Sequence, residues 1–265
     1  MKNSLINILN QDNGVLRLTL DDENNKNALS KAMIGELTEA INAANNNKEV
    51  KVIIIASIGN VFCSGHNLKE ITAARNNNDE GESYFKNLFE LCSSLMHLIV
   101  SCSKPVIAEV DGIATAAGCQ LVASCDLAIS SSTAKFATPG VNIGLFCSTP
   151  MVALSRNVSK KEAMKMLLTG DMIDADEAKR ISLINDYVSD DKLEESVNNL
   201  ALKISKKSSM TVKIGKEAFY KQAEMSLSDA YAYTSVVMAQ NTLNVDAKEG
   251  ISSFIEKRDP NWQDN

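Results

Sequence analysis

The sequence contains only two histidines among its 265 residues, and no two of its cysteines have the CxxC spacing. Protein zinc sites combine histidine and cysteine at short, fixed spacings, so the sequence predicts no metal centre. Most of the six cysteines lie inside apolar runs, where a free thiol behaves as a small hydrophobic group. We therefore expect them to act as packing residues: Cys63, Cys92, Cys102, Cys119, Cys125 and Cys147.

Three other features are missing. No apolar run approaches the roughly 20 residues of a membrane span, which predicts no membrane partner. The formal net charge is −6, and the basic residues are scattered without a basic, aromatic-rich face, which predicts no nucleic-acid partner. The first residues, MKNSLINIL, lack the regions of a signal peptide and the arginine bias of a transit peptide. From these absences we expect a cytoplasmic protein.

The residues that are present favour an α/β fold of one large domain, or a domain with an appendage. Val15 to Leu20 alternates apolar and polar residues, as a half-buried strand does, and Ser30 is a suitable N-cap for the amphipathic helix that follows. Val50 to Ala56 is almost wholly apolar, which is typical of a strand covered on both faces in a parallel sheet. The first half of the chain therefore predicts right-handed βαβ units.

The second half is predicted to be mainly helical. We place a soft boundary near Val188, which separates an α/β core (residues 1–188) from a helical region (residues 189–265). Two further expectations concern local structure. Residues 72–83 are rich in Asn and acidic residues, which predicts a mobile surface loop, and Asp246 with Glu249 has the spacing of a capping box.

One stretch combines a strand, a tight turn and a helix start within twenty-three residues, from Lys104 to Asp126. An apolar strand is broken at Asp111-Gly112, and a helix is expected to begin near Ala117-Gly118. The N–H groups at a helix start have no intrahelical partner and carry the positive end of the helix dipole. Such groups can hold an oxygen atom that becomes negative during a reaction.

A second glycine-bearing turn precedes another helix start at Phe62 to Glu70, with the sequence FCSGHNLKE. Together with DGIATAAGCQL at Asp111 to Leu121, this turn resembles the enoyl-CoA hydratase/isomerase (crotonase) family. Four more segments match in the same order, so the resemblance covers essentially the whole chain, and the run from Thr138 to Pro150 resembles a single branch of the family. These segments are NALS at 27–30, TPGVNIGL at 138–145, LTG at 168–170 and FIEKR at 254–258.

The resemblance implies a fold and an assembly. The fold is a spiral of ββα turns followed by a helical C-terminal trimerisation region, and the chain forms a homotrimer or a homohexamer built from two trimers. The implied substrate is an acyl-CoA thioester. Coenzyme A then arrives as part of the substrate, and no tightly bound cofactor is expected.

The resemblance also implies the site residues. The backbone N–H groups of His66 and Ala117 are the two donors of an oxyanion hole, and losing one such donor typically costs a factor of about 10²–10³ in rate. Asn67 stands where the family usually has Asp. The implied contacts of coenzyme A are Ala28, Ser64, His66, Asn67, Leu68 and Lys69, with Phe254 and Lys257 contributed by a neighbouring subunit.

The two acids of a hydratase are missing. Hydratases of this family position water with two glutamates, at the positions occupied here by Gln120 and Gly140, and neither of these residues can titrate. General acid–base catalysis contributes a factor of about 10²–10⁴, so water addition is predicted to be weak or absent. Three functions stay open: a hydratase/isomerase-type lyase or isomerase with another acid–base group, a non-catalytic acyl-CoA-binding protein, and a small-acyl-CoA decarboxylase or thioesterase that uses His66.

Overall fold

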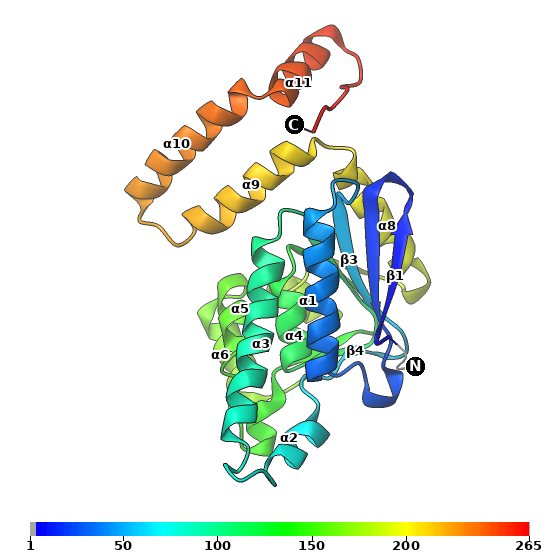
Figure 1. Cartoon of the computed structure of the whole chain (residues 1–265), viewed down its shortest axis with the longest axis vertical. Coiled ribbons are helices and arrows are strands. Elements are labelled where there is room, and N and C mark those ends of the chain that lie inside the picture. The colour runs from blue at the N-terminus through cyan, green and yellow to red at the C-terminus, as the bar shows by residue number, and fades with distance from the viewer. Residues whose placement is uncertain (1–3, 265) are drawn as a thin grey trace.

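The computed structural model describes residues 4–264 and contains two sheets (Figure 1). In the six-stranded sheet the order is β1-β2-β3-β5-β7-β10; β1 pairs antiparallel with β2, and every other pair is parallel. Its strands are β1 (Ile6–Gln11), β2 (Val15–Leu20), β3 (Val52–Ser57), β5 (Val106–Val110), β7 (Leu127–Ser131) and β10 (Asp186–Val188). The small sheet has the order β4 (Val61–Cys63), β6 (Ile113–Thr115), β8 (Lys135–Ala137) and β9 (Ile173–Asp174).

Helices cover both faces of the large sheet. On one face the main core joins the strands to α1, α3 and α4, and on the other face α8 forms a smaller apolar cluster with β2, β3 and β5. The helices of this body are α1 (Lys31–Asn46), α2 (Leu68–Ala74), α3 (Glu82–Ser101), α4 (Ala117–Ser124), α5 (Pro150–Asn157), α6 (Lys160–Thr169), α7 (Ala175–Arg180) and α8 (Leu193–Ser205).

Three further helices stand apart from this body and form an arm (Figure 1). They are α9 (Ser209–Gln222), α10 (Leu227–Leu243) and α11 (Val245–Glu256). The arm lies at the end of the molecule opposite α2. The α/β fold with parallel strands, repeated strand–helix turns and a C-terminal helical region was predicted from the sequence and is confirmed.

The predicted helix after Ser30 is also confirmed. The Ser30 side chain accepts a hydrogen bond from the N–H of Met33, which satisfies one free donor of α1. The helix is amphipathic as predicted, and six of its apolar residues are buried: Met33, Ile34, Leu37, Ala40, Ile41 and Ala44. Their spacing places them on one face of the helix, and this face packs against the main core.

Two local predictions were wrong. The loop expected over residues 72–83 is limited to residues 75–81, because α2 continues to Ala74 and α3 begins at Glu82. Asp246 does not cap α11, since Asn244 occupies the N-cap position. The buried Asp246 carboxylate instead accepts hydrogen bonds from the Ser208 hydroxyl and from two N–H groups of the C-terminal segment.

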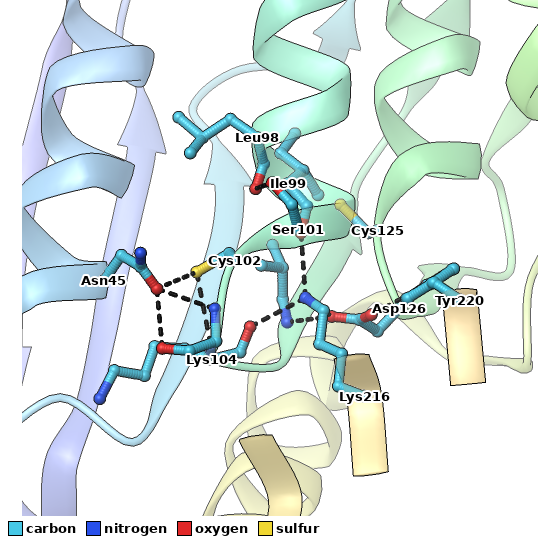
Figure 2. A network of polar contacts seen from close by, with 12 residues as sticks. Asn45, Leu98, Ile99, Ser101, Cys102, Lys104, Cys125, Asp126, Lys216 and Tyr220 are labelled. Atoms are coloured by element: carbon cyan, nitrogen blue, oxygen red, sulfur yellow. Dashed lines mark hydrogen bonds and ion pairs between the residues drawn. The ribbon is translucent and has the colours of Figure 1, made fainter. Parts of the chain in front are cut away.

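The ammonium group of Lys216 anchors the arm to the body (Figure 2). It donates to the Ile99 carbonyl at 2.9 Å, to the Lys104 carbonyl at 3.0 Å and to the Asp126 carboxylate at 2.6 Å. Tyr220, one turn further along α9, donates its hydroxyl to the other oxygen of Asp126 at 2.9 Å. The cation also lies at the C-terminal end of α3, where the helix dipole is negative. Asp126 and Lys216 thus form a buried ion pair that joins α9 to the ends of α3 and α4.

Replacing Lys216 by Met should destabilise the protein by about 3–5 kcal/mol, because it leaves the buried Asp126 carboxylate without its cation. Urea unfolding measures this change, and amide hydrogen exchange should accelerate first in α9 to α11. The matched control is Lys192→Met, which breaks an exposed ion pair with Glu195 and should change little. Equal stability of the two variants would contradict the anchoring role of Lys216.

Candidate functional site

Two parallel strands of the small sheet bring the two glycine-bearing turns together. β4 ends at Cys63 and β6 ends at Thr115, and the Thr115 hydroxyl donates to the Ser64 carbonyl at 3.2 Å. A Cβ atom at Gly118 would lie 2.1 Å from the carbonyl oxygen of Cys63, so only glycine allows this approach. A Cβ atom at Gly65, where φ is +93°, would lie 3.3 Å from the backbone nitrogen of Ala117. The His66 turn therefore lies directly against the start of α4.

Two backbone N–H groups are free at this junction. Among the described residues, neither the N–H of His66 nor that of Ala117 donates to an acceptor of the protein. Ala117 is the first residue of α4, so its N–H also lies at the positive end of the helix dipole. The two turns that carry the N–H groups implied by the resemblance therefore lie in contact, and a free N–H group at a helix start can accept an oxygen that carries negative charge.

The residue before Ala117 has a strained backbone. Ala116 has φ 51° and ψ −118°, a region that costs a non-glycine residue on the order of 1–3 kcal/mol. Its N–H donates to the carbonyl of Ala137 at 2.9 Å, which continues the pairing of β6 with β8. Sheet pairing on one side and α4 on the other hold Ala116 in this conformation, at the point where the chain turns toward the free N–H of Ala117.

Burial favours the neutral form of the His66 side chain. Its Nδ1 lies 3.3 Å from the Leu29 carbonyl, which can only accept, so Nδ1 carries the hydrogen and Nε2 is an acceptor. Burial lowers the pKa of the imidazole, although the Leu29 carbonyl and the Glu70 carboxylate oppose that shift. The ring also packs edge-on against Phe89.

The two positions of the family's glutamates differ in the space around them. Gln120 is 4% exposed on α4, and its side-chain carbonyl has no protein partner. A Cβ atom at Gly140 would lie 2.7 Å from the Leu145 carbonyl and 2.9 Å from Cys147 Sγ. The loop after Gly140 therefore occupies the place where a side chain at this position would begin. Burial raises the pKa of the Cys147 thiol, which makes it a poor nucleophile.

Six of the eight predicted coenzyme A contacts gather at the His66 turn. The carbonyl oxygen of Lys26 accepts the N–H of Ser64, and the Asn67 side chain caps α2. Lys69 directs its ammonium group to Asn25 at 3.3 Å. The six are Ala28, Ser64, His66, Asn67, Leu68 and Lys69. The structure of one chain does not bring the other two to this turn, because Phe254 and Lys257 belong to the end of α11, on the arm (Figure 1).

Sequence reasoning missed two groups near this turn. Glu70 accepts hydrogen bonds from the Tyr84 hydroxyl at 2.8 Å and from the N–H of Lys31, which ties α2 to α3 and α1. Thr138 follows directly on Ala137, is 1% exposed, and has a hydroxyl without a protein partner. From the sequence, only the position of Thr138 directly before the short helix Pro139–Ile143 could have pointed to it. In the structure its side chain does not cap that helix.

Residues 4–264 contain neither a cluster of metal ligands nor a helix that could span a membrane. In that range no group of three or more His, Cys, Asp or Glu side chains is placed to hold a metal ion. None of the helices described is both long and apolar enough to cross a bilayer.

Comparisons with known proteins give consistent similarities. The profile of the family described as enoyl-CoA hydratase/isomerase matches residues 10–265. The Xenopus laevis protein named enoyl-CoA hydratase domain-containing protein 3, mitochondrial, is 47% identical over 99% of this chain and 87% of its own length. The crystal structure of human enoyl coenzyme A hydratase domain-containing protein 3 has a TM-score of 0.92 at 43% identity and covers 97% of this chain and 100% of that one. The crystal structure of an enoyl-CoA hydratase from Mycobacterium smegmatis has a TM-score of 0.93 at 43% identity and covers 98% of this chain and 99% of that one.

These similarities confirm one prediction and correct another. The branch indicated by the run from Thr138 to Pro150 is that of enoyl-CoA hydratase domain-containing protein 3, which these relatives represent. The predicted cytoplasmic location is wrong, because five relatives that carry the name of this branch are named as mitochondrial. The prediction rested on the composition of the first residues. A targeting segment is separate from the fold and is removed from it, so a folded domain does not encode its compartment.

Replacing Ala116 by Gly should stabilise the protein by about 1 kcal/mol, since glycine adopts a positive φ without the steric cost that alanine has. Thermal and urea unfolding measure the change. The same replacement at Ala43, inside α1, is the control and should destabilise by roughly 0.5–1 kcal/mol. A loss of stability in Ala116→Gly would show that this backbone conformation is not strained.

Proposed function

The chain belongs to the enoyl-CoA hydratase/isomerase family, and on that premise we propose that it binds acyl-CoA thioesters and polarises the thioester carbonyl. The observation that carries the proposal is the pair of free N–H groups of His66 and Ala117, on two turns in direct contact. The carbonyl oxygen of the acyl group accepts from both. Negative charge that develops on this oxygen is then stabilised by the two donors and by the α4 dipole.

The lyase or isomerase chemistry of the family requires a proton to move, and this chain has few groups that move one. Gln120 is uncharged, and the loop at Leu145 to Cys147 fills the space beside Gly140. The protein is therefore proposed to polarise acyl-CoA thioesters strongly while adding water to enoyl-CoA weakly. Binding without turnover of any thioester is the alternative, which the lack of a titratable side chain at Gln120 and Gly140 favours.

Coenzyme A is proposed to lie along the His66 turn as part of the substrate. Lys69 supplies a positive charge, while Ala28, Ser64, Asn67 and Leu68 contact the nucleotide and pantetheine portions. Phe254, which is 85% exposed, and Lys257 complete this site from a neighbouring subunit, since within one chain they lie on the arm, away from α2.

A homotrimer, alone or paired into a hexamer, is proposed because the arm exposes many large apolar side chains. Burying them against another copy removes apolar surface from water, at about 25 cal/mol per Å². In this assembly residues 1–188 supply the acyl-CoA-binding core, and residues 189–265 contain the oligomerisation surface. The exposed side chains include Leu227, Tyr231, Met238, Leu243, Phe254 and Ile255.

Calorimetry with coenzyme A, acetyl-CoA and butyryl-CoA tests the binding. We expect saturable binding of all three, and mass spectrometry of acyl-CoA thioesters incubated with the protein then reports any turnover. Absence of binding to every one of them would overturn the proposal. Binding with no turnover would select the non-catalytic alternative.

Replacing Gln120 by Glu should raise the rate of crotonyl-CoA hydration by about 10-fold or more, because it restores one of two acid–base groups with almost no change in shape. Gly140→Glu should give no such gain, since its side chain would meet Leu145 and Cys147. Hydration is followed by the loss of the enoyl thioester absorbance, and the affinity of each variant for butyryl-CoA is measured in parallel. A larger gain from Gly140→Glu would show that the loop gives way easily.

A further inference from the structure

The segment that follows α11 runs back to the start of α9 (Figure 1). It begins at Arg258, whose guanidinium group donates to both oxygens of the Glu249 carboxylate on α11, at 2.6 Å and 2.9 Å. The N–H of Asn261 donates to the same carboxylate at 2.8 Å. One acidic side chain of α11 therefore holds the first part of this segment.

Trp262 carries the segment from α11 to the end of α8. Its indole N–H donates at 2.8 Å to the carbonyl of Lys206, the residue directly after α8. The ring lies against α11, because a Cβ atom at Gly250 would lie 3.1 Å from it. The next two N–H groups of the segment donate to the buried Asp246 carboxylate, at 2.7 Å and 3.1 Å. The middle of the segment is thus bound to two helices.

Asp264 ties the segment to the body. Its carboxylate accepts from the Lys51 ammonium group at 2.8 Å and from the N–H of Ser209, the first residue of α9, at 2.6 Å. Burial alone would raise the pKa of the Asp264 carboxyl, but these two partners lower it, so the group is an anion at neutral pH. Lys51 directly precedes β3. The segment therefore joins the last helix of the arm to the large sheet.

The bend at the end of α11 contains the two arm residues that were assigned to coenzyme A. Lys257 has φ +57°, a left-handed conformation that costs a non-glycine residue on the order of 1–3 kcal/mol. The N–H of Arg258 donates to the carbonyl of Ser253 at 3.0 Å, and the N–H of Lys257 donates to that of Phe254 at 3.3 Å. These bonds close the bend from the helix side, and the side chain of Arg258 holds it from the other side.

We propose that residues 258–264 form a strap that positions Phe254 and Lys257 for the coenzyme A site of a neighbouring copy. This inference rests on the acyl-CoA binding and the assembly proposed above. The strap closes the arm into a ring, and its ion pair with Lys51 fastens that ring to the sheet. The side chains that hold the strap are positioning groups: they touch no ligand, and they act through Lys257, whose positive charge suits the phosphate groups of the nucleotide.

The experiment uses two substitutions together in the full chain, Glu249→Gln and Lys51→Met. They remove an ionic contact at each end of the strap and leave the net charge of the protein unchanged. By calorimetry, coenzyme A should bind roughly 3–20-fold more weakly, because each of the two partly exposed ion pairs contributes a modest factor. Butyryl-pantetheine, which lacks the nucleotide, should bind as it does to the unaltered protein.

The matched control is Glu177→Gln with Lys179→Met. It also leaves the net charge unchanged, but it breaks two exposed ion pairs of α7, so neither affinity should change. Fluorescence supplies a second readout, because Trp262 is the only tryptophan of the sequence and therefore reports on the strap alone. Acrylamide should quench this fluorescence more strongly in the strap variant than in the control, since a released strap exposes the indole.

Gly250→Ala tests the strap while every ionic contact stays in place. Alanine is favoured over glycine inside a helix, so Gly35→Ala in α1, whose Cβ atom would meet nothing within 4 Å, should raise the melting temperature. In Gly250→Ala the new Cβ atom displaces the Trp262 ring, and we expect stronger quenching without that rise. An equal rise in both variants, with unchanged quenching, would overturn the contact of the strap with α11.

The outcomes separate the strap from the proposed function. Equal coenzyme A affinities of the strap variant and the control would overturn the positioning role and leave acyl-CoA binding intact. An equal loss of affinity for butyryl-pantetheine would also overturn it, because the strap acts on the nucleotide end. Absence of binding of coenzyme A and butyryl-CoA to the unaltered protein would overturn the proposed function itself.

Discussion

The contact between the end of β4 and the start of α4 is the constraint on which the candidate site depends. With a Cβ atom, residue 118 would lie 2.1 Å from the carbonyl oxygen of Cys63, far inside van der Waals contact. Glycine at this position lets the two backbones approach, so that the two turns lie against each other. The strain at Ala116 belongs to the same arrangement, since the chain must leave β6 and enter α4 within one residue.

Burial gives this site its chemical character. Glutamine and threonine are uncharged, burial favours the neutral form of His66, and two carboxylates of this body are engaged in other contacts. Glu70 holds α2 through Tyr84 and Lys31, while Glu109 forms a buried pair with Arg17 beneath α8. The site can therefore orient and polarise a ligand with fixed dipoles, whereas it has few groups that transfer protons.

Much of this arrangement could be predicted from the sequence, because glycine spacing and apolar periodicity are local signals. The turns at Gly65 and Gly118, the helix after Ser30 and the apolar β3 all followed from such patterns. Other features depend on contacts between distant segments. β1 was not predicted because most of its side chains are exposed, and only pairing with β2 identifies it as a strand. Asp246 has the spacing of a cap, but the C-terminal segment and Ser208 compete for its carboxylate. Thr138 became a candidate only when its lack of a partner was visible.

The wholly buried α4 is about 12 Å long and is fixed at both ends. Its first residue supplies the N–H of Ala117, and just past its last residue Asp126 binds Lys216 of α9. A short helix of this kind moves as a rigid rod. One buried helix of two turns therefore links the candidate site to the root of the arm.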